Sequence, residues 1–286
     1  MNILPQLVIN SIIAGSIYSL VALGFNLIYG TTKFFNLAYG VLATIGGYAV
    51  FYFFKTLGLP LIPSVILGII IAGLIGYLID QSVFRQLRAR KASGMVFLVA
   101  SLGIMTALQA IVAIIFTSQF QTLSTGSFKV YKILGGVITE VQLIILVSAI
   151  VIMIGLALLL KYTRFGKAVR AVSDEEEVSK IVGIDTNKII GKVFFIGSAI
   201  AGLSGVLVGF DTGIEPGMGL SLLLKGVIAS IIGGIGNVYG GVLGAFLLGF
   251  VENFGIWKIS GEWKDAIAFG LLLIFLLFRP QGIIKK

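Results

Sequence analysis

Long apolar runs separated by short polar stretches dominate this chain. An α-helix rises about 1.5 Å per residue, so about 20 apolar residues are needed to cross the ~30 Å hydrocarbon core of a membrane. Two of the shorter runs fall below that length and fit only half-helices or crossings of a thinned bilayer. The pattern predicts an all-α polytopic transmembrane helical bundle with eight or nine crossings, including short or broken helices. The six expected full spans are 7–28, 62–84, 96–116, 141–160, 189–209 and, with its flanks, 266–278; the shorter runs are 35–54, 222–235 and 238–251.

One polar stretch, residues 161–192, interrupts the apolar pattern. Ser173 stands three residues before Glu176, which is the spacing of a capping box and predicts a short helix that begins at Asp174. Gly183 supplies a natural C-terminal stop. Negative charge is favourable in the first turn of a helix, where it meets the positive end of the helix dipole. That turn carries the acidic run Asp174, Glu175, Glu176 and Glu177.

The short helix is expected to be amphipathic. Val178, Ile181 and Val182 share one face by their spacing, and Ile184 follows just past the end. An isolated helix of about nine residues is marginal in water, so this one must lean on something. The residues alone leave two alternatives: it rests on lipid headgroups, or it lies in the groove of a partner protein.

Composition agrees with an integral membrane protein. The chain is 58% hydrophobic and 12% charged, with a mean hydropathy of +1.09, whereas soluble domains are about 25% charged. It has no Cys and no His, which removes disulfides, thiol nucleophiles, His-based catalysis and the commonest metal ligands. No GxxxxGK[ST] motif is present. We therefore expect no enzyme activity, no cofactor and no ATP site on this chain.

The net charge of +9 is unevenly distributed. Lys and Arg gather in three regions, 85–91, 161–192 and 279–286, and such clusters mark the cytoplasmic side of membrane proteins. This predicts an external N-terminus and a cytoplasmic C-terminus, and no nucleic-acid partner is needed to explain the charge. The segment 118–140 is then the largest external loop, either a plain connection or part of a receptor for a partner protein.

Two glycine-rich breaks, residues 30–40 and 233–237, put polar residues between apolar runs. Irregular backbone at membrane depth survives only where it is buried in protein or lines a wet cavity. The breaks are therefore either surface turns or part of a translocation path. The candidate path residues are Asn26, Asn36, Gly40, Gly233, Gly234 and Gly236.

Three stretches together resemble a known family. They are TRFGKAVRAVSDEEEVSKIVGI, NLIYGTTKFFNLAYGVLATIGGY and LKGVIASIIGGIGNVYGGVLGAFLLGFVEN. They are similar to ABC-importer permeases of the branched-chain amino-acid (Liv) type, and specifically to the shorter of the two permease subunits. The family usually has alanine where this chain has Val178. The resemblance implies that the first break lies along the translocation route.

In that family the short helix packs into a cleft on a separate ATPase subunit. The resemblance thus implies a coupling role for Ser173, Asp174, Glu175, Glu176, Glu177, Val178, Ile181, Val182, Gly183 and Ile184. It also implies a second permease subunit or a second copy, cytoplasmic ATP-binding subunits, an extracytoplasmic binding protein and contact with membrane lipid. The expected location is the cytoplasmic membrane of a bacterium or archaeon.

The expected function is that of one transmembrane permease domain, 1–286, which couples ATP hydrolysis in partner subunits to import of branched-chain amino acids. Urea or another small amide is an alternative substrate. An ion-coupled secondary transporter is the other alternative, but it would need ionisable residues within the spans. The candidates for that role are Asp80, Asp211, Glu215, Lys225 and Glu252.

Overall fold

The computed structural model describes residues 3–124, 129–133, 135–257 and 259–284. In this part of the chain six helices are long and apolar enough to cross a membrane, which confirms the all-α transmembrane bundle. A π-helical turn (Asp80–Phe84) joins α3 to α4 as one continuous helix of 29 residues. The long helices are α1 (Ile3–Thr32), α3 (Leu61–Ile79) with α4 (Arg85–Ala89), α5 (Gly94–Phe116), α6 (Glu140–Tyr162), α9 (Thr186–Asp211) and α11 (Val238–Gly255).

The remaining helices are shorter. A π-helical turn (Tyr52–Thr56) extends α2, and a 3-10 turn (Gly261–Trp263) precedes α12. The run 238–251 was expected to be too short to cross, but α11 continues to Gly255 and reaches 18 residues because polar Glu252 and Asn253 are buried within the protein. The shorter helices are α2 (Ala38–Phe51), α7 (Arg164–Asp174), α8 (Glu176–Ile181), α10 (Met218–Gly233) and α12 (Lys264–Phe278).

The expected external loop contains a small hairpin. Strands β1 (Val130–Ile133) and β2 (Gly136–Thr139) pair antiparallel, with Val130 opposite Thr139. The Gln6 side chain holds the hairpin against α1, since its Nε2 donates to the Val137 carbonyl at 3.0 Å and its Oε1 accepts from the Val137 amide at 2.7 Å. Residues 125–128 and 134 of the expected loop lie outside the described part.

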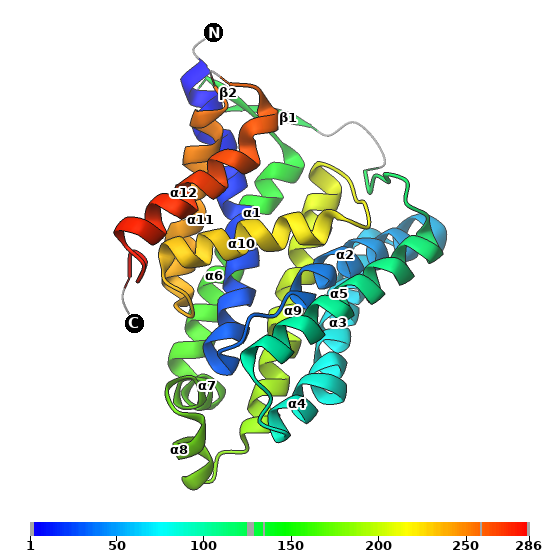
Figure 1. Ribbon diagram of the computed structural model, residues 1–286. Helices are drawn as coiled ribbons and strands as arrows, with labels where there is room; N and C mark the ends of the chain where they lie inside the picture. Colours follow the sequence, from blue (N-terminus) through cyan, green and yellow to red (C-terminus); the bar gives the residue numbers. More distant parts are fainter. Residues whose placement is uncertain (1–2, 125–128, 134, 258, 285–286) are drawn as a thin grey trace.

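Helix α1 is the centre of the bundle. It contacts α6, α9, α10 and α11, and in Figure 1 α10 crosses it steeply while α9 and α11 run beside it. Small residues allow these close approaches, as is usual where membrane helices pack. Gly15 on α1 faces Phe246, and Gly249 on α11 faces the backbone of Ser11. The most buried large side chains accordingly include Leu20, Leu23 and Phe25 of α1.

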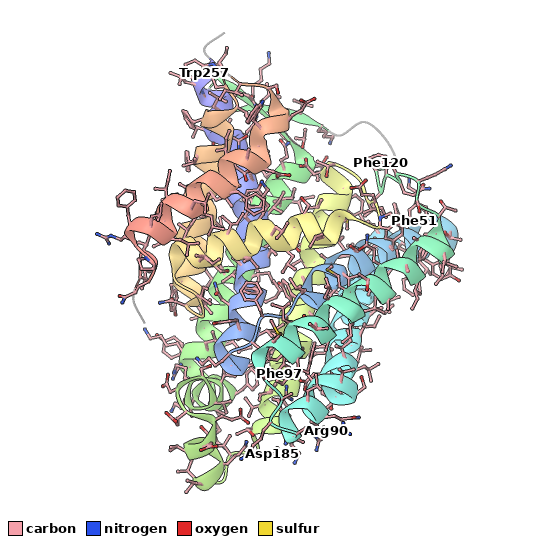
Figure 2. The ribbon with its side chains drawn as sticks, in the orientation of Figure 1. Phe51, Arg90, Phe97, Phe120, Asp185 and Trp257 are labelled. Atoms are coloured by element: carbon pink, nitrogen blue, oxygen red, sulfur yellow. The ribbon has the colours of Figure 1, made fainter. Side chains whose placement is uncertain are left out.

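The molecule has two distinct ends. Figure 1 places α4, α7 and α8 at one end and the hairpin with the first turns of α1 at the other. In Figure 2, Arg90 and Asp185 lie at the first end and Trp257 lies at the second. Two of the three basic regions therefore share one end, opposite the hairpin, as the positive-inside pattern requires.

Candidate functional site

The polar stretch 161–192, which we call the coupling segment, forms its helices at other positions than the predicted cap indicates. Thr163, not Ser173, begins the first helix: its side chain accepts a hydrogen bond from the Gly166 amide at 3.0 Å, and α7 then runs on through Ser173 to Asp174. The predicted helix start at Asp174 is therefore wrong. Helix α7 continues because Val169 and Val172 are buried along one face, and this packing outweighs the local cap signal.

Helix α8 begins two residues later than predicted, at Glu176, and its N-cap Glu175 makes no side-chain capping bond. The Glu176 carboxylate pairs with Lys180 at 2.8 Å instead of reaching back to an N-cap. The predicted stop is confirmed. The Gly183 amide donates to Lys180 and the Ile184 amide to Ser179, and Gly183 has a φ of +86°, as a Schellman motif requires.

Helix α8 presents its apolar face to the outside. Val178, Ile181 and Val182 are 54%, 84% and 68% exposed, whereas Ser179 on the other side of the helix is buried. Asp185 then caps α9 and pairs with Lys188 at 3.0 Å. The hydrogen bonds from Lys188 lower the pKa of Asp185 below its usual range, so this cap is charged at neutral pH.

The two glycine-rich breaks meet in space. Asn26, buried within α1, accepts a hydrogen bond from the Gly236 amide at 2.8 Å through its side-chain oxygen. A Cβ placed on Gly30 would lie 3.4 Å from the Gly236 carbonyl oxygen. Residues about 210 positions apart in the sequence thus form one junction between α1 and the α10–α11 connection.

A cavity of about 320 Å³ connects this junction to the coupling segment. We call it the coupling-side cavity. Its walls come from α1, the end of α6, α7 and the start of α11, so a movement of α7 would change its shape directly. It is lined by Asn26, Leu27, Gly30, Leu160, Lys161, Val169, Arg170, Ser173, Asp174, Gly236, Asn237, Val238 and Tyr239.

The other predicted path residues lie in packed backbone. Asn36 is buried in the turn between α1 and α2, and its side-chain oxygen has no hydrogen-bond partner among the described residues. Gly40 lies against the carbonyl of Gly219 on α10. Gly233 packs against Gly240, and Gly234 lies against the backbone of the C-terminal segment. Of the six predicted path residues, only Asn26 and Gly236 line the coupling-side cavity.

The structure contains a cluster of charged residues near the hairpin end that the sequence did not predict. Lys225 of α10 and Glu252 of α11 were each candidates for ionisable residues within the spans. In the structure they are both buried and paired, with Lys225 Nζ 2.5 Å from Glu252 Oε1. Tyr18 donates to Glu252 at 2.7 Å, and Asp265 pairs with Lys225 at 2.8 Å. The detectable signal was one cation and one anion in neighbouring apolar runs, which must pair when both are buried.

This cluster borders a second cavity, of about 420 Å³, which we call the hairpin-side cavity. It lies among α1, α6, α9, α10, α11 and α12, at the first half of α1. It is lined by Asn10, Ile13, Ala14, Ile17, Tyr18, Gln142, Val208, Asp211, Thr212, Ser221, Leu222, Lys225, Asn253, Lys264 and Asp265.

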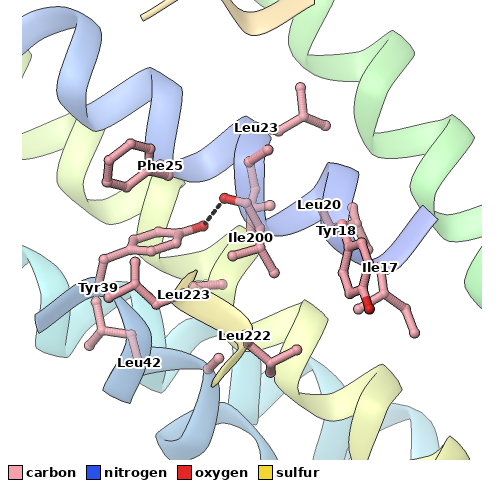
Figure 3. Close-up of a cluster of buried hydrophobic side chains, with 14 of the residues drawn as sticks. Ile17, Tyr18, Leu20, Leu23, Phe25, Tyr39, Leu42, Ile200, Leu222 and Leu223 are labelled. Atoms are coloured by element: carbon pink, nitrogen blue, oxygen red, sulfur yellow. Dashed lines mark hydrogen bonds between the residues drawn. The ribbon is translucent and has the colours of Figure 1, made fainter. Parts of the chain in front are cut away.

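Packed core separates the two cavities along α1. Leu20, Ala22 and Leu23 are completely buried between them. Figure 3 shows this region, where the Tyr39 hydroxyl donates to the Val21 carbonyl at 3.0 Å and ties α2 to α1. The described helices therefore form two hollows at opposite halves of α1 with a closed section in the middle, an arrangement suited to alternating access.

Comparisons with known proteins identify the family. Residues 7–276 match the family described as the permease component of branched-chain amino acid transport systems. The chain is 35% identical to the high-affinity branched-chain amino acid transport system permease protein BraD of Pseudomonas aeruginosa, over 98% of this chain and 95% of that protein. It is 31% identical to LivH of Escherichia coli K12, a permease protein of the same printed description, with the same coverage.

A solved structure also shares the fold. PsaBC from Streptococcus pneumoniae in complex with Fab aligns with a TM-score of 0.53, covering 98% of this chain and 93% of that chain at 13% identity. At that identity the likeness concerns the fold alone. The family match and the curated relatives both extend over nearly the whole chain, so this chain belongs to the branched-chain amino acid transport permease family.

Proposed function

We propose that this chain is a transmembrane permease subunit of an ABC importer for branched-chain amino acids. The family match over residues 7–276 is the observation that carries the proposal. The structure adds support, because an exposed apolar helix lies at the end of the molecule that carries two basic regions. In the proposed complex, ATP is hydrolysed by partner subunits, a second permease subunit or second copy completes the channel, and an extracytoplasmic binding protein delivers the solute.

Helix α8 is the proposed contact with the ATPase. Its exposed apolar face, formed by Val178, Ile181 and Val182, would be buried in a groove on that subunit. The adjacent α7 lines the coupling-side cavity through Val169, Arg170 and Ser173. A displacement of α8 by the ATPase would therefore move α7, and α7 would move the wall of the cavity at the junction of the two breaks. This is the proposed physical connection between ATP hydrolysis and the translocation path.

The path itself is proposed to run along α1 from the hairpin-side cavity to the coupling-side cavity. Asn26 and Gly236 line it directly. Gly40 and Gly233 are proposed to shape it indirectly, since Gly40 packs against Gly219 of α10 and Gly233 packs against Gly240 of α11. Asn36 and Gly234 are proposed to do so from the turns in which they lie, between α1 and α2 and after α10. The membrane is proposed to be the cytoplasmic membrane, with the hairpin outside and α7 and α8 in the cytoplasm.

The substitution Ile181→Asp tests the coupling contact. Ile181 is 84% exposed, so a carboxylate at this position stays solvated in the isolated permease. Once buried against the ATPase, the same carboxylate would be an unpaired charge in an apolar site and would weaken the association by on the order of several kcal/mol. We expect normal membrane insertion with loss of ATPase co-purification and of leucine uptake into proteoliposomes that contain the complete importer.

Lys188→Gln is the matched control for Ile181→Asp. Lys188 lies in the same segment with a side chain that is 79% exposed, and its pairing with Asp185 is a surface ion pair worth at most about 1 kcal/mol. This variant should assemble and transport normally. Unchanged leucine uptake by Ile181→Asp would show that α8 rests on headgroups and does not dock.

A further inference from the structure

We propose that the hairpin-side cavity is a binding site for a small zwitterionic amino acid with an apolar side chain. The inference rests on the proposed import function and adds a site within the permease. The volume of about 420 Å³ lies within the range of small-molecule pockets, about 300–1,000 Å³. Ionisable residues within membrane spans are costly and usually mark a solute or ion pathway, and this cavity gathers several of them.

One wall offers a site for the solute ammonium group. Asp211 ends α9, and its carboxylate accepts a long hydrogen bond of 3.4 Å from Gln142 Nε2. No Lys or Arg in the described part of the chain forms an ion pair with Asp211. Gln142 is itself held in place, because its Oε1 accepts from the Thr139 amide in the capping box of α6. A cationic solute group would supply the partner that this positioned carboxylate lacks.

Two lysines in the same lining offer cations for the solute carboxylate. Lys225 is held between buried Glu252 and Asp265, whose side chain is 71% exposed and therefore able to swing away. Lys264 lies 3.7 Å from Glu252, the longest ion pair in the cluster, and its side chain is 37% exposed. A solute carboxylate can thus replace Asp265 on Lys225, or take up Lys264, without leaving Glu252 unpaired.

The rest of the lining suits an aliphatic side chain. Ile13 and Ile17 of α1, Val208 of α9 and Leu222 of α10 give the cavity apolar surface beside its charged groups. Asn10 and Ser221 add polar groups at its margin. The cavity therefore combines an anion, cations and apolar surface, which matches the three parts of an aliphatic amino acid. A pure ion site would not need the apolar wall.

The absence of native cysteine allows a direct test. Ser221→Cys and Thr212→Cys place single reporters on two exposed positions of the lining, and a charged thiol reagent measures their reactivity in membranes that contain the assembled importer without its binding protein. A transit site must bind weakly enough to release its solute. With a dissociation constant of about 1 mM, ~10 mM leucine should slow labelling about tenfold.

Two analogues and one variant define the chemistry of the site. Isocaproate lacks the ammonium group and isopentylamine lacks the carboxylate, so neither should protect the reporters at the same concentration. Asp211→Asn should abolish protection by leucine while labelling without leucine continues. Gln109→Cys, in a separate hollow beside α5 and Glu215, is the control reporter and should not respond to leucine.

Several results would overturn the inference. They are equal protection by either analogue, protection that survives Asp211→Asn, and failure of both reporters to react, since a solute site must admit a small polar reagent. A zwitterionic lipid headgroup in the cavity would give slow labelling in vesicles with phosphatidylethanolamine, fast labelling without it, and no response to leucine. Leucine uptake by the unmodified importer is measured in parallel, so that a failed site is distinguished from a failed import function.

Discussion

Asn26 is the residue that holds the two glycine-rich breaks together. Its side-chain oxygen accepts from the Gly236 amide, and its Nδ2 lies against Gly241 of α11. Gly236 lies in the connection after α10 has ended at Gly233, so its amide has no helical acceptor and needs another one. A buried amide without an acceptor is costly, so one side chain stabilises a turn far away in the sequence.

The substitution Asn26→Ala should destabilise this junction. It leaves the Gly236 amide without its acceptor, at a cost of about 1–3 kcal/mol. We expect a lower melting temperature for the purified permease and reduced leucine uptake by the complete importer. Thr32→Ala is the matched control on the same helix, because the Thr32 hydroxyl only donates to the Ile28 carbonyl of its own helix. Equal melting temperatures for the two variants would contradict the proposed role of Asn26.

At the residue scale, the sequence singled out individual residues better than it predicted the contacts between them. Asn26 and Gly236 were both candidates for one path, but their hydrogen bond joins two breaks that no local pattern connects. Lys225 and Glu252 were recognised as costly charges within the spans, but the sequence did not show that they pair with each other in the interior. Such pairs form because helices pack in three dimensions, which spacing along a single chain does not encode.

At the scale of elements, α2 and α10 approach each other at two glycines. A Cβ on Gly40 would lie 2.5 Å from the Gly219 carbonyl oxygen and 2.9 Å from Leu223 Cβ. The obstacle is partly backbone, which cannot rotate aside as a side chain does. The structure thus gives Gly40 a packing role between two helices, and an enlarged side chain here separates α2 from α10 before it narrows any path.

Gly40→Ala should therefore lower stability by about 1–3 kcal/mol, as overpacking of a tight contact does. Gly103→Ala is the matched control, since a Cβ at this exposed position of α5 would have no neighbour within 4 Å. That control should be neutral or up to about 1 kcal/mol more stable, because alanine favours helix over glycine. The measurement is thermal unfolding of the detergent-solubilised permease. A Gly40→Ala protein as stable as Gly103→Ala would contradict the close approach.

The positions of the helices followed from the sequence, whereas some of their lengths and ends did not. All nine apolar runs lie largely in helices, because a helix is the structure that satisfies backbone groups within lipid. The capping-box signal at Ser173 failed, since Thr163 starts α7 and the burial of Val169 and Val172 carries it past Ser173. A true capping box occurs at Thr139 and Gln142, where the expected loop 118–140 meets the expected span 141–160.

At the scale of the whole molecule, the distribution of basic residues and the arrangement of the helices both distinguish two ends. Helices α4, α7 and α8 lie opposite the hairpin (Figure 1), and the basic regions 85–91 and 161–192 lie in or next to these helices in the sequence. The last described residues lie beside the α10–α11 connection, where the Ile283 amide donates to the Ile232 carbonyl and the Ile284 amide to the Gly233 carbonyl. The arrangement of helices could not be derived from hydropathy, because hydropathy alone does not distinguish apolar surface that faces lipid from apolar surface that faces protein.

Single cysteines test the orientation of this molecule in the membrane. Lys132→Cys reports on the hairpin, and Lys167→Cys reports on α7 at the opposite end. In intact cells an impermeant external reagent should label Lys132→Cys and leave Lys167→Cys unreacted, because only the hairpin end faces outward. Permeabilised cells should label both and serve as the control. External labelling of Lys167→Cys, or of both positions, would overturn the proposed orientation.

The pairing of Ile283 and Ile284 with the end of α10 has a practical consequence for engineering this protein. The segment that reaches Ile284 covers the last carbonyls of α10 next to the Gly236 junction. A purification tag or fluorescent protein fused closely behind Ile284 would pull on that segment and, through it, on the turn that Asn26 holds. A reporter intended to leave transport undisturbed belongs on the hairpin side, or behind a long flexible linker.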